Sequence, residues 1–125
     1  RRKEIIKKYD EACDELGVIH LQHYGKDFAS SGHLYLTRIP GASDEQRREI
    51  ITKLAERGVN TNVHYKPLPM MTAYKNMGWD IKNFPNAYAY YENLITLPLH
   101  TKLSDEDVEY VTENFKAVVS AYTSK

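Results

Sequence analysis

The stretch His33-Leu-Tyr-Leu-Thr-Arg-Ile-Pro-Gly-Ala-Ser-Asp-Glu-Gln46 combines a strand signal, a turn and a helix start. Residues 33–39 alternate between two faces and are rich in strand-forming side chains, which predicts a strand. Pro40-Gly41 ends that strand. Ser43 and Gln46 then form a capping box, in which each side chain binds the other residue's backbone amide. A helix is predicted to begin at this box.

The helix after Ser43 is predicted to bury one stripe and to end at Gly58, which supplies a left-handed stop. The next segment, residues 59–65, alternates again in the period of a strand. The order strand, helix, strand is therefore predicted between residues 33 and 65. The buried stripe consists of Ile50, Ile51 and Leu54, while Arg47, Arg48, Lys53 and Arg57 are expected to stay in solvent.

Further helices and strands are predicted on both sides of this unit. One core is expected for 125 residues without an internal repeat or linker. Strands separated by helices predict an α+β fold, with a small, mostly antiparallel sheet covered by helices. The outer elements are a helix to Leu16 closed by Gly17, a strand over 18–22, a short helix over 70–77, a helix from Pro85, a strand over 94–97 and a helix from Ser104.

The stretch Asn60-Thr-Asn-Val-His-Tyr-Lys-Pro-Leu-Pro69 reads as a strand that stops in a loop carrying His64, Tyr65 and Lys66. Its two prolines remove backbone donors and stiffen the loop, which suits a loop that fixes side chains for a ligand. A cation beside a histidine and a tyrosine is suited to an anion such as phosphate. The alternative is structural: Tyr65 in the core, His64 satisfied at the surface and Lys66 solvated.

A second cation stands on the predicted strand over residues 33–39. Arg38 shares the face of Leu34 and Leu36, where an arginine must reach past the sheet edge or pair with an acid. The functional alternative is that Arg38 binds a carboxylate or a phosphate. Both interpretations are kept.

Composition excludes several classes of function. Seventeen basic residues balance seventeen acidic ones and the sequence pI is about 7.1, so no nucleic-acid or membrane partner is expected. The one cysteine, Cys13, excludes an internal disulfide and fits a reducing compartment, so the cytoplasm is expected. His20 and His23 lack further ligands for a metal, and no nucleophile motif or glycine-rich phosphate loop is present. No catalytic residue is predicted.

Tyrosine is over-used, with ten tyrosines against three phenylalanines and one tryptophan. Tyrosine suits surfaces that are half apolar and half wet, which indicates an interface. The chain also begins at Arg1, inside a predicted helix and without methionine. We therefore expect a piece of a longer protein, with self-association of the piece through surface that the parent covers.

Six stretches occur in an order that resembles a known family. Together they are similar to the C-terminal portion of the DegT/DnrJ-type sugar aminotransferases, and the resemblance covers nearly the whole chain. The stretches are Arg1-Arg2 with Tyr9, Ser31-Gly-His-Leu-Tyr-Leu-Thr-Arg38, the helix from Arg47 to Gly58, Thr61-Asn-Val-His-Tyr-Lys-Pro-Leu-Pro69, Phe84-Pro-Asn-Ala87, and Leu97-Pro-Leu99 before Leu103-Ser-Asp-Glu-Asp-Val108.

The resemblance implies a parent enzyme of fold type I that depends on pyridoxal phosphate (PLP). Such enzymes move an amino group, commonly from glutamate, to a keto sugar on a nucleotide carrier in sugar and polysaccharide biosynthesis. The parent is expected to be a homodimer. PLP and its lysine belong to a large N-terminal domain in this family, and no stretch here matches the lysine motif. This chain alone is therefore expected to bind no PLP and to be inactive.

The resemblance also assigns parts of the chain. Residues 1–16 would end the helix that joins the two domains, and residues 17–125 would form the small C-terminal domain. His64, Tyr65 and Lys66 would face the nucleotide-sugar substrate, with Arg38 and Tyr35 as lesser candidates. Two alternatives stay open: a free-standing binding or regulatory module of the same fold, and an unrelated small α+β protein.

Overall fold

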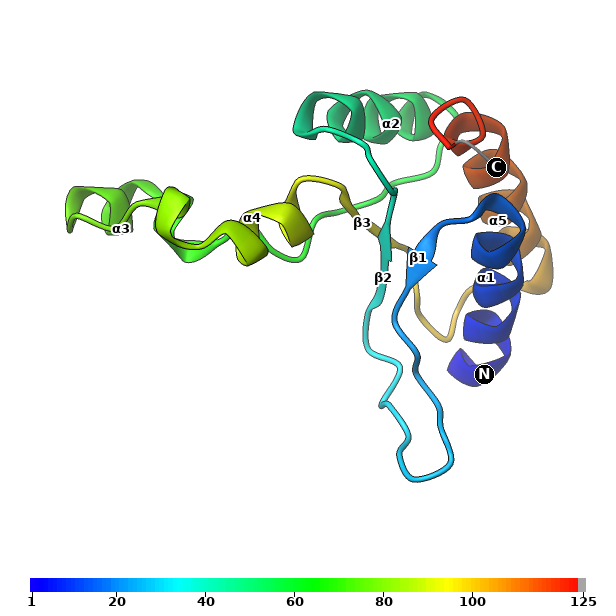
Figure 1. Cartoon of the computed structure of the whole chain (residues 1–125). Coiled ribbons are helices and arrows are strands. Elements are labelled where there is room, and N and C mark those ends of the chain that lie inside the picture. The colour runs from blue at the N-terminus through cyan, green and yellow to red at the C-terminus, as the bar shows by residue number, and fades with distance from the viewer. Residues whose placement is uncertain (124–125) are drawn as a thin grey trace.

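The structure, a computed structural model, describes residues 1–123. Along these residues, five α-helices, two short 3-10 helices and three strands follow one another (Figure 1). Their bounds are α1 Arg2–Leu16, β1 Ile19–His20, β2 Tyr35–Arg38, α2 Asp44–Glu56, η1 Leu68–Met70, α3 Thr72–Asn76, η2 Ile81–Asn83, α4 Pro85–Tyr91, β3 Leu94–Leu97 and α5 Asp105–Val119.

The three strands form one antiparallel sheet in the order β1-β2-β3. Tyr35 is paired with Leu97 and Leu36 with Thr96, so β2 and β3 match along their whole length. β1 adds only two residue pairs at the other edge of β2. This arrangement confirms the α+β class and the antiparallel sheet that the sequence predicts.

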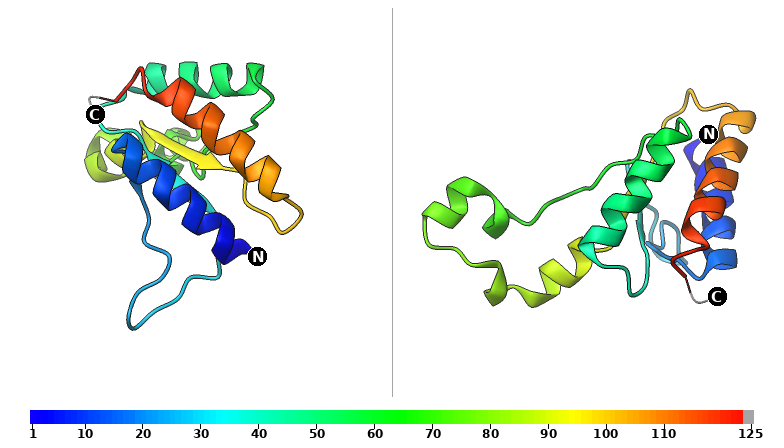
Figure 2. Two further views of the ribbon diagram at one scale, coloured as in Figure 1. Left: turned by 90° about the vertical axis from the view of Figure 1, so that its right-hand side faces the viewer. Right: turned by 90° about the horizontal axis from the view of Figure 1, so that it is seen from above.

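The core lies between the sheet and the helices. Helices α1 and α5 run side by side over one face of the sheet, and α2 lies next to α5 (Figure 2). Tyr9, Tyr35 and Phe115 are the largest side chains that are almost fully buried there. The Tyr9 hydroxyl donates to the Pro98 carbonyl at 2.7 Å, so this ring is buried without an unpaired polar atom.

The helix ends follow the sequence signals closely. Ser43 and Ser104 each form the complete capping box, with Gln46 and Asp107 as their partners. Gly17 ends α1 in the left-handed conformation that only glycine adopts readily. These local devices fix where the layers of the fold begin and end.

Two segments leave this body. Residues 21–34 form a long loop between β1 and β2. Residues 66–91, which we call the arm, extend away from the body on the side opposite α1 and α5 (Figures 1 and 2). The arm contains η1, α3, η2 and α4, and every residue from 71 to 80 is exposed. The arm therefore contributes little to the core.

The predicted strand over residues 59–65 is wrong. Only Asn62 pairs there, through an isolated bridge in which it exchanges two backbone hydrogen bonds with Thr96, at 3.1 and 2.7 Å. The backbone amide of Val63 donates to Asn62 Oδ1 at 2.7 Å, so this amide is not available for a hydrogen bond to β3. The segment thus lies along β3 without becoming a regular strand.

Three other predicted elements differ in extent. The strand predicted over 18–22 reduces to Ile19–His20, the strand predicted over 33–39 reduces to Tyr35–Arg38, and the helix predicted over 70–77 becomes η1 followed by α3. Pro69 lies inside η1 and cannot donate to a regular helical turn, so the backbone changes course before α3 begins. No helix among residues 1–123 is both long enough and apolar enough to cross a bilayer.

Candidate functional site

The candidate site begins with a polar residue in the middle of a buried strand. Thr96 of β3 is buried, and its Oγ1 lies 3.0 Å from Nδ1 of His64. The bridge between Asn62 and Thr96 brings the backbone of the His64 segment to the same place. Strand β3 therefore orients the His64 imidazole through Thr96. The other ring nitrogen, Nε2, has no partner among the described residues and can meet a ligand.

Tyr65 and Lys66 complete the exposed part of this site. The Tyr65 ring stands edge-on to the His64 ring, with centroids 4.7 Å apart, and 68% of Tyr65 is exposed. The peptide bond between His64 and Tyr65 is cis. Lys66 is exposed as well. The interpretation that places Tyr65 in the core is therefore wrong. The loop presents an imidazole, a phenol and an ammonium group to solvent.

Arg38 lies on the same face of the sheet as the His64 loop. Leu36 is the register partner of Thr96, and Arg38 follows two residues later, so period-two geometry keeps it on that face. Its guanidinium donates to Asn93 Oδ1 and to the Ala89 carbonyl, both at 3.1 Å, and stacks 4.5 Å above the Tyr90 ring. Arg38 thus holds the end of α4 rather than an acidic side chain.

Arg47 grips the same helix from α2. Its guanidinium donates to the Tyr91 carbonyl at 2.7 Å, pairs with Asp44 and lies 4.3 Å from the centre of the Tyr91 ring. Only 3% of Arg47 is exposed, so the prediction that it stays in solvent is wrong. The available signal was its spacing, because position 47 falls on the helical stripe of Ile50 and Leu54.

Tyr35 faces the opposite side of β2, inside the core. Its hydroxyl donates to Asp10 Oδ1 at 2.6 Å and lies 3.8 Å from the sulfur of Cys13. Burial, together with Cys13 and Asp10, raises the pKa of Tyr35 well above its ordinary value. The structure therefore does not bring Tyr35 to the His64 loop.

Cys13 is buried on α1. Burial raises the pKa of its thiol to about 12, against the weaker opposing effect of the Tyr35 hydrogen bond. A thiol in this state is a poor nucleophile at neutral pH.

His20 and His23 pack against Tyr35 from β1 and the loop that follows. His20 pairs with Asp10 at 3.1 Å and with Asp14 at 3.0 Å, which ties β1 to α1. His23 stacks on the Tyr35 ring at 5.6 Å, and its Nδ1 lies 3.0 Å from Ser30 Oγ. Among residues 1–123 no group of three or more potential ligands could hold a metal ion. Both histidines therefore have structural partners.

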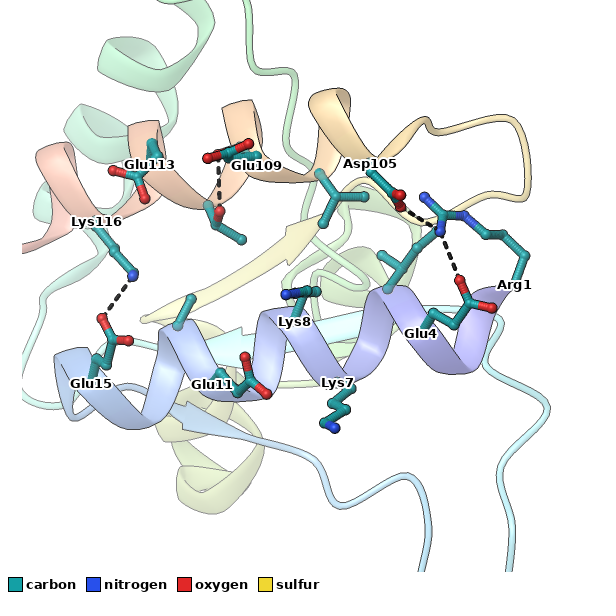
Figure 3. A pocket seen from close by; sticks show the side chains of 14 residues that line it. Arg1, Glu4, Lys7, Lys8, Glu11, Glu15, Asp105, Glu109, Glu113 and Lys116 are labelled. Atoms are coloured by element: carbon teal, nitrogen blue, oxygen red, sulfur yellow. Dashed lines mark hydrogen bonds and ion pairs between the residues drawn. The ribbon is translucent and has the colours of Figure 1, made fainter.

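A cavity of about 650 Å³ lies between α1 and α5, away from the His64 loop (Figure 3). Ion pairs cross it at both ends, from Arg1 to Asp105 at 2.6 Å and from Lys116 to Glu15 at 2.6 Å. Exposed lysines and glutamates of both helices line the space between, so the charges are of mixed sign. The ion pairs thus join the two helices, and the mixed charges of the cavity do not favour one class of ligand.

Comparison with known proteins identifies the family. The DegT/DnrJ/EryC1/StrS aminotransferase family matches residues 1–116. The chain belongs to this family. Spr1654 of Streptococcus pneumoniae, assigned as a sugar aminotransferase, has been solved in its PLP form. Its sequence is 52% identical to this chain. The match covers 98% of this chain and 31% of Spr1654, and the two structures superpose with a TM-score of 0.93.

Curated relatives in the family are less similar in sequence. The spore coat polysaccharide biosynthesis protein SpsC of Bacillus subtilis (strain 168) is 32% identical over 95% of this chain and 31% of the relative. The dTDP-3-amino-3,6-dideoxy-alpha-D-galactopyranose transaminase of Aneurinibacillus thermoaerophilus is 30% identical over 90% of this chain and 29% of the relative. The chain thus spans less than a third of the length of these relatives.

The family implies PLP, and the described residues do not fit this cofactor. PLP enzymes bind their cofactor through a lysine amine, which becomes reactive when it is desolvated. None of the lysines that the structure describes is buried. Lys66, two residues after His64, is exposed to solvent. No step of amino transfer is therefore assigned to these residues.

Proposed function

We propose that this chain is the C-terminal domain of a PLP-dependent aminotransferase that aminates a keto sugar on a nucleotide carrier. Family membership over residues 1–116 carries the proposal. The names of relatives support a nucleotide sugar, since they include a dTDP-sugar transaminase and a UDP-sugar transaminase. Glutamate is the proposed amino donor, and sugar or polysaccharide biosynthesis is the proposed setting.

In this proposal the domain supplies one wall of the substrate site. Bound PLP acts as the electron sink for amino transfer, and its lysine belongs to the part of the parent outside these 125 residues. His64, held by Thr96, offers Nε2 to a hydroxyl or a phosphate oxygen of the substrate. Lys66 attracts the negative diphosphate of the carrier, and Tyr65 adds a hydroxyl and an exposed ring.

Arg38 and Tyr35 have weaker support as substrate contacts. Two nitrogens of Arg38 already bind Asn93 and Ala89, and the Tyr35 hydroxyl binds Asp10. We retain Arg38 as a residue that positions the segment next to the site. We further propose that the parent is a homodimer, as its family implies. A cytoplasmic location is proposed because the single cysteine suits a reducing compartment.

The test uses the full-length parent, purified with PLP. Glutamate should convert the cofactor to pyridoxamine phosphate (PMP). The absorption spectrum follows this conversion. A nucleotide-linked keto sugar should then return the PLP form and yield an aminated sugar, detected by mass spectrometry. No aminated product from any UDP- or dTDP-linked keto sugar would contradict the proposed function.

A matched pair of lysine variants tests the site itself. Lys66→Ala should raise the KM for the nucleotide sugar roughly tenfold, because a charge-assisted contact to the diphosphate is lost. Lys75→Ala is the control, since Lys75 is also exposed but lies on α3 of the arm. Equal KM values for the two variants would contradict the proposal that the His64 loop contacts the substrate.

A further inference from the structure

Thr96 places a hydroxyl group inside the sheet, directly beneath the His64 loop. The other residues of β3 are apolar and buried, and only 5% of Thr96 is exposed. A buried hydroxyl is costly unless it takes part in a hydrogen bond. The hydrogen-bond partner of this hydroxyl therefore shows what the threonine does at this position.

The Thr96 hydroxyl contacts one polar group among residues 1–123, which is Nδ1 of His64 at 3.0 Å. The backbone of Thr96 is already paired, because its amide donates to the Asn62 carbonyl at 2.7 Å and its carbonyl accepts from the Asn62 amide at 3.1 Å. These two bonds hold Asn62 opposite Thr96, two residues before His64. The backbone pairing thus brings the imidazole and the hydroxyl together.

A count of donors and acceptors decides which of the two groups donates. A neutral imidazole carries its proton on either Nδ1 or Nε2. If the proton were on Nδ1, it would point at Thr96, and the buried hydroxyl proton would have no acceptor within the described part of the chain. If Thr96 donates, Nδ1 accepts and the ring proton lies on Nε2. Buried donors are nearly always paired, which favours the second arrangement.

Thr37 shows a different use of a buried threonine in the same sheet. It lies on β2, is fully buried, and its Oγ1 donates to the Ile95 carbonyl at 2.7 Å. This hydroxyl joins two strands of the core. Leu36 is the register partner of Thr96, so Thr37 and Thr96 lie on opposite faces of the sheet. Only the Thr96 hydroxyl contacts a side chain of the candidate site.

We propose that Thr96 is a positioning residue that fixes the tautomer of His64, so that the ring presents Nε2–H to the substrate as a hydrogen-bond donor. This inference rests on the proposed function and deepens it. A donor at Nε2 selects an oxygen that accepts, and a nucleotide sugar offers such oxygens on its diphosphate and on its sugar. Lys66 has only donors as well, so both groups favour the same class of partner.

The first experiment locates the ring proton directly. The full-length parent, labelled with ¹⁵N in its histidine rings, is studied by solid-state NMR at about pH 8.5, roughly two units above the ordinary histidine pKa. The signals that disappear in His64→Gln belong to His64. They should show a proton on Nε2 and none on Nδ1. A proton on Nδ1 would overturn the proposal, and this result needs no variant of Thr96.

The same spectrum tests whether Thr96 is responsible. In Thr96→Val the Nδ1 signal of His64 should move or split, because Val has a similar shape but no hydroxyl. Thr37→Val is the matched control: it removes a buried hydroxyl from the same sheet and should leave the His64 signals in place. An unchanged Nδ1 signal in Thr96→Val would overturn the proposal.

Kinetics then test whether the tautomer matters to the substrate. Thr96→Val should raise the KM for the nucleotide sugar roughly fivefold, as for the loss of one hydrogen bond, while Thr96→Ser should stay within about twofold of the unaltered protein. Thr37→Val should not change KM. In a His64→Gln background Thr96→Val should have no further effect, because Thr96 acts through His64. Additive effects of these two substitutions would overturn the proposal.

Binding of the carrier alone separates the two sources of the acceptor. If Thr96→Val weakens the binding of UDP or dTDP in calorimetry, the acceptor is a diphosphate oxygen. If it weakens only the binding of the nucleotide sugar, the acceptor is an oxygen of the sugar. If it weakens neither, the proposal is overturned. The tautomer is measured without substrate, so a proton on Nε2 in a parent that aminates no sugar would refute the proposed function alone.

Discussion

The body and the arm of this protein use the same kinds of side chain in opposite ways. In the body, Tyr9, Tyr35 and Phe115 are at most 1% exposed between the sheet and two helices. In the arm, Tyr74, Met77 and Trp79 are between 38% and 72% exposed. Apolar character alone therefore does not decide burial here. What differs is that elements of the body close over one another, whereas the arm leads away from them.

This difference divides the chain into a part that stabilises the fold and a part that contributes little to it. The stability of the chain resides in the body, because most of the apolar area that it removes from water lies there. The position of the arm depends on two arginines and one bridge at its base. The tip of the arm then contributes little to folding, because its side chains stay exposed. Substitutions in the three places should have effects of different size.

The largest effect is expected in the body. Phe115→Ala should lower the free energy of unfolding by about 3–5 kcal/mol, because it opens a cavity in a fully packed core. Urea unfolding followed by circular dichroism measures the change. A loss below about 1 kcal/mol would mean that α5 does not close the core as described.

The base of the arm should show an intermediate effect. Arg47→Met should cost about 1–3 kcal/mol, because the Tyr91 carbonyl and Asp44 lose a buried partner. Arg48→Met is the matched control, since Arg48 also pairs with Asp44 but is 71% exposed, and its loss should stay within about 0.5 kcal/mol. Trypsin should also cut the arm faster in Arg47→Met, at Lys75 and Lys82. Equal effects of both variants would refute the anchoring role.

Two histidines, His20 and His23, should contribute to the pH dependence of the stability of the body. Burial alone would lower the pKa of His20, but the hydrogen bonds to Asp14 and Leu21 and the charge of Asp10 raise it above 6.5. A raised pKa stabilises the fold below pH 6.5, and this stabilisation is lost as the pH rises through the folded value. Burial lowers the pKa of His23, so its contribution is present above pH 6.5 and is lost as the pH falls.

Two variants separate these contributions, each smaller than about 1 kcal/mol. His20→Asn should flatten the decline of stability on the alkaline side of pH 6.5, and His23→Asn should flatten the decline on the acidic side. Thermal melting between pH 5 and pH 8 covers the range in which histidine titrates. If the two variants changed the same side of the profile, the assigned contacts of one histidine would be wrong.

The smallest effect is expected at the tip of the arm. Met77→Ala should change the free energy of unfolding of this chain by no more than about 0.5 kcal/mol, because the side chain is 72% exposed. The same urea assay provides the measurement. A loss comparable with that of Phe115→Ala would show that the arm packs onto the body in solution.

The parts of the fold with local signals could be predicted from the sequence. The capping box at Ser43, the helix start at Ser104 and the stop at Gly17 were found at their residues, because each is determined by neighbours within one helical turn. The strand over 94–97 was found because a short apolar run is cut by a proline. The class of the fold followed from these elements.

The parts that depend on distant partners could not be predicted. Alternation in residues 59–65 shows which side each residue faces, but it cannot show that only Asn62 finds a backbone partner on β3. The course of the arm was missed because its tyrosines and methionines resemble core residues in a linear pattern. His64, Tyr65 and Lys66 are consecutive, so the sequence groups them, and their role as substrate contacts stays a prediction. The contact of Thr96 with His64 needed the sheet register.

The grip on α4 has a consequence for how this family can diversify. Arg38 and Arg47 both bind backbone carbonyls, of Ala89 and Tyr91, and a carbonyl is present whatever residue occupies the position. Apart from Tyr90 and Tyr91, whose rings also stack on these arginines, residues of the arm can therefore change without loss of its attachment. The side chains of the arm are thus free to differ among relatives, while the framework that holds the arm is inherited unchanged.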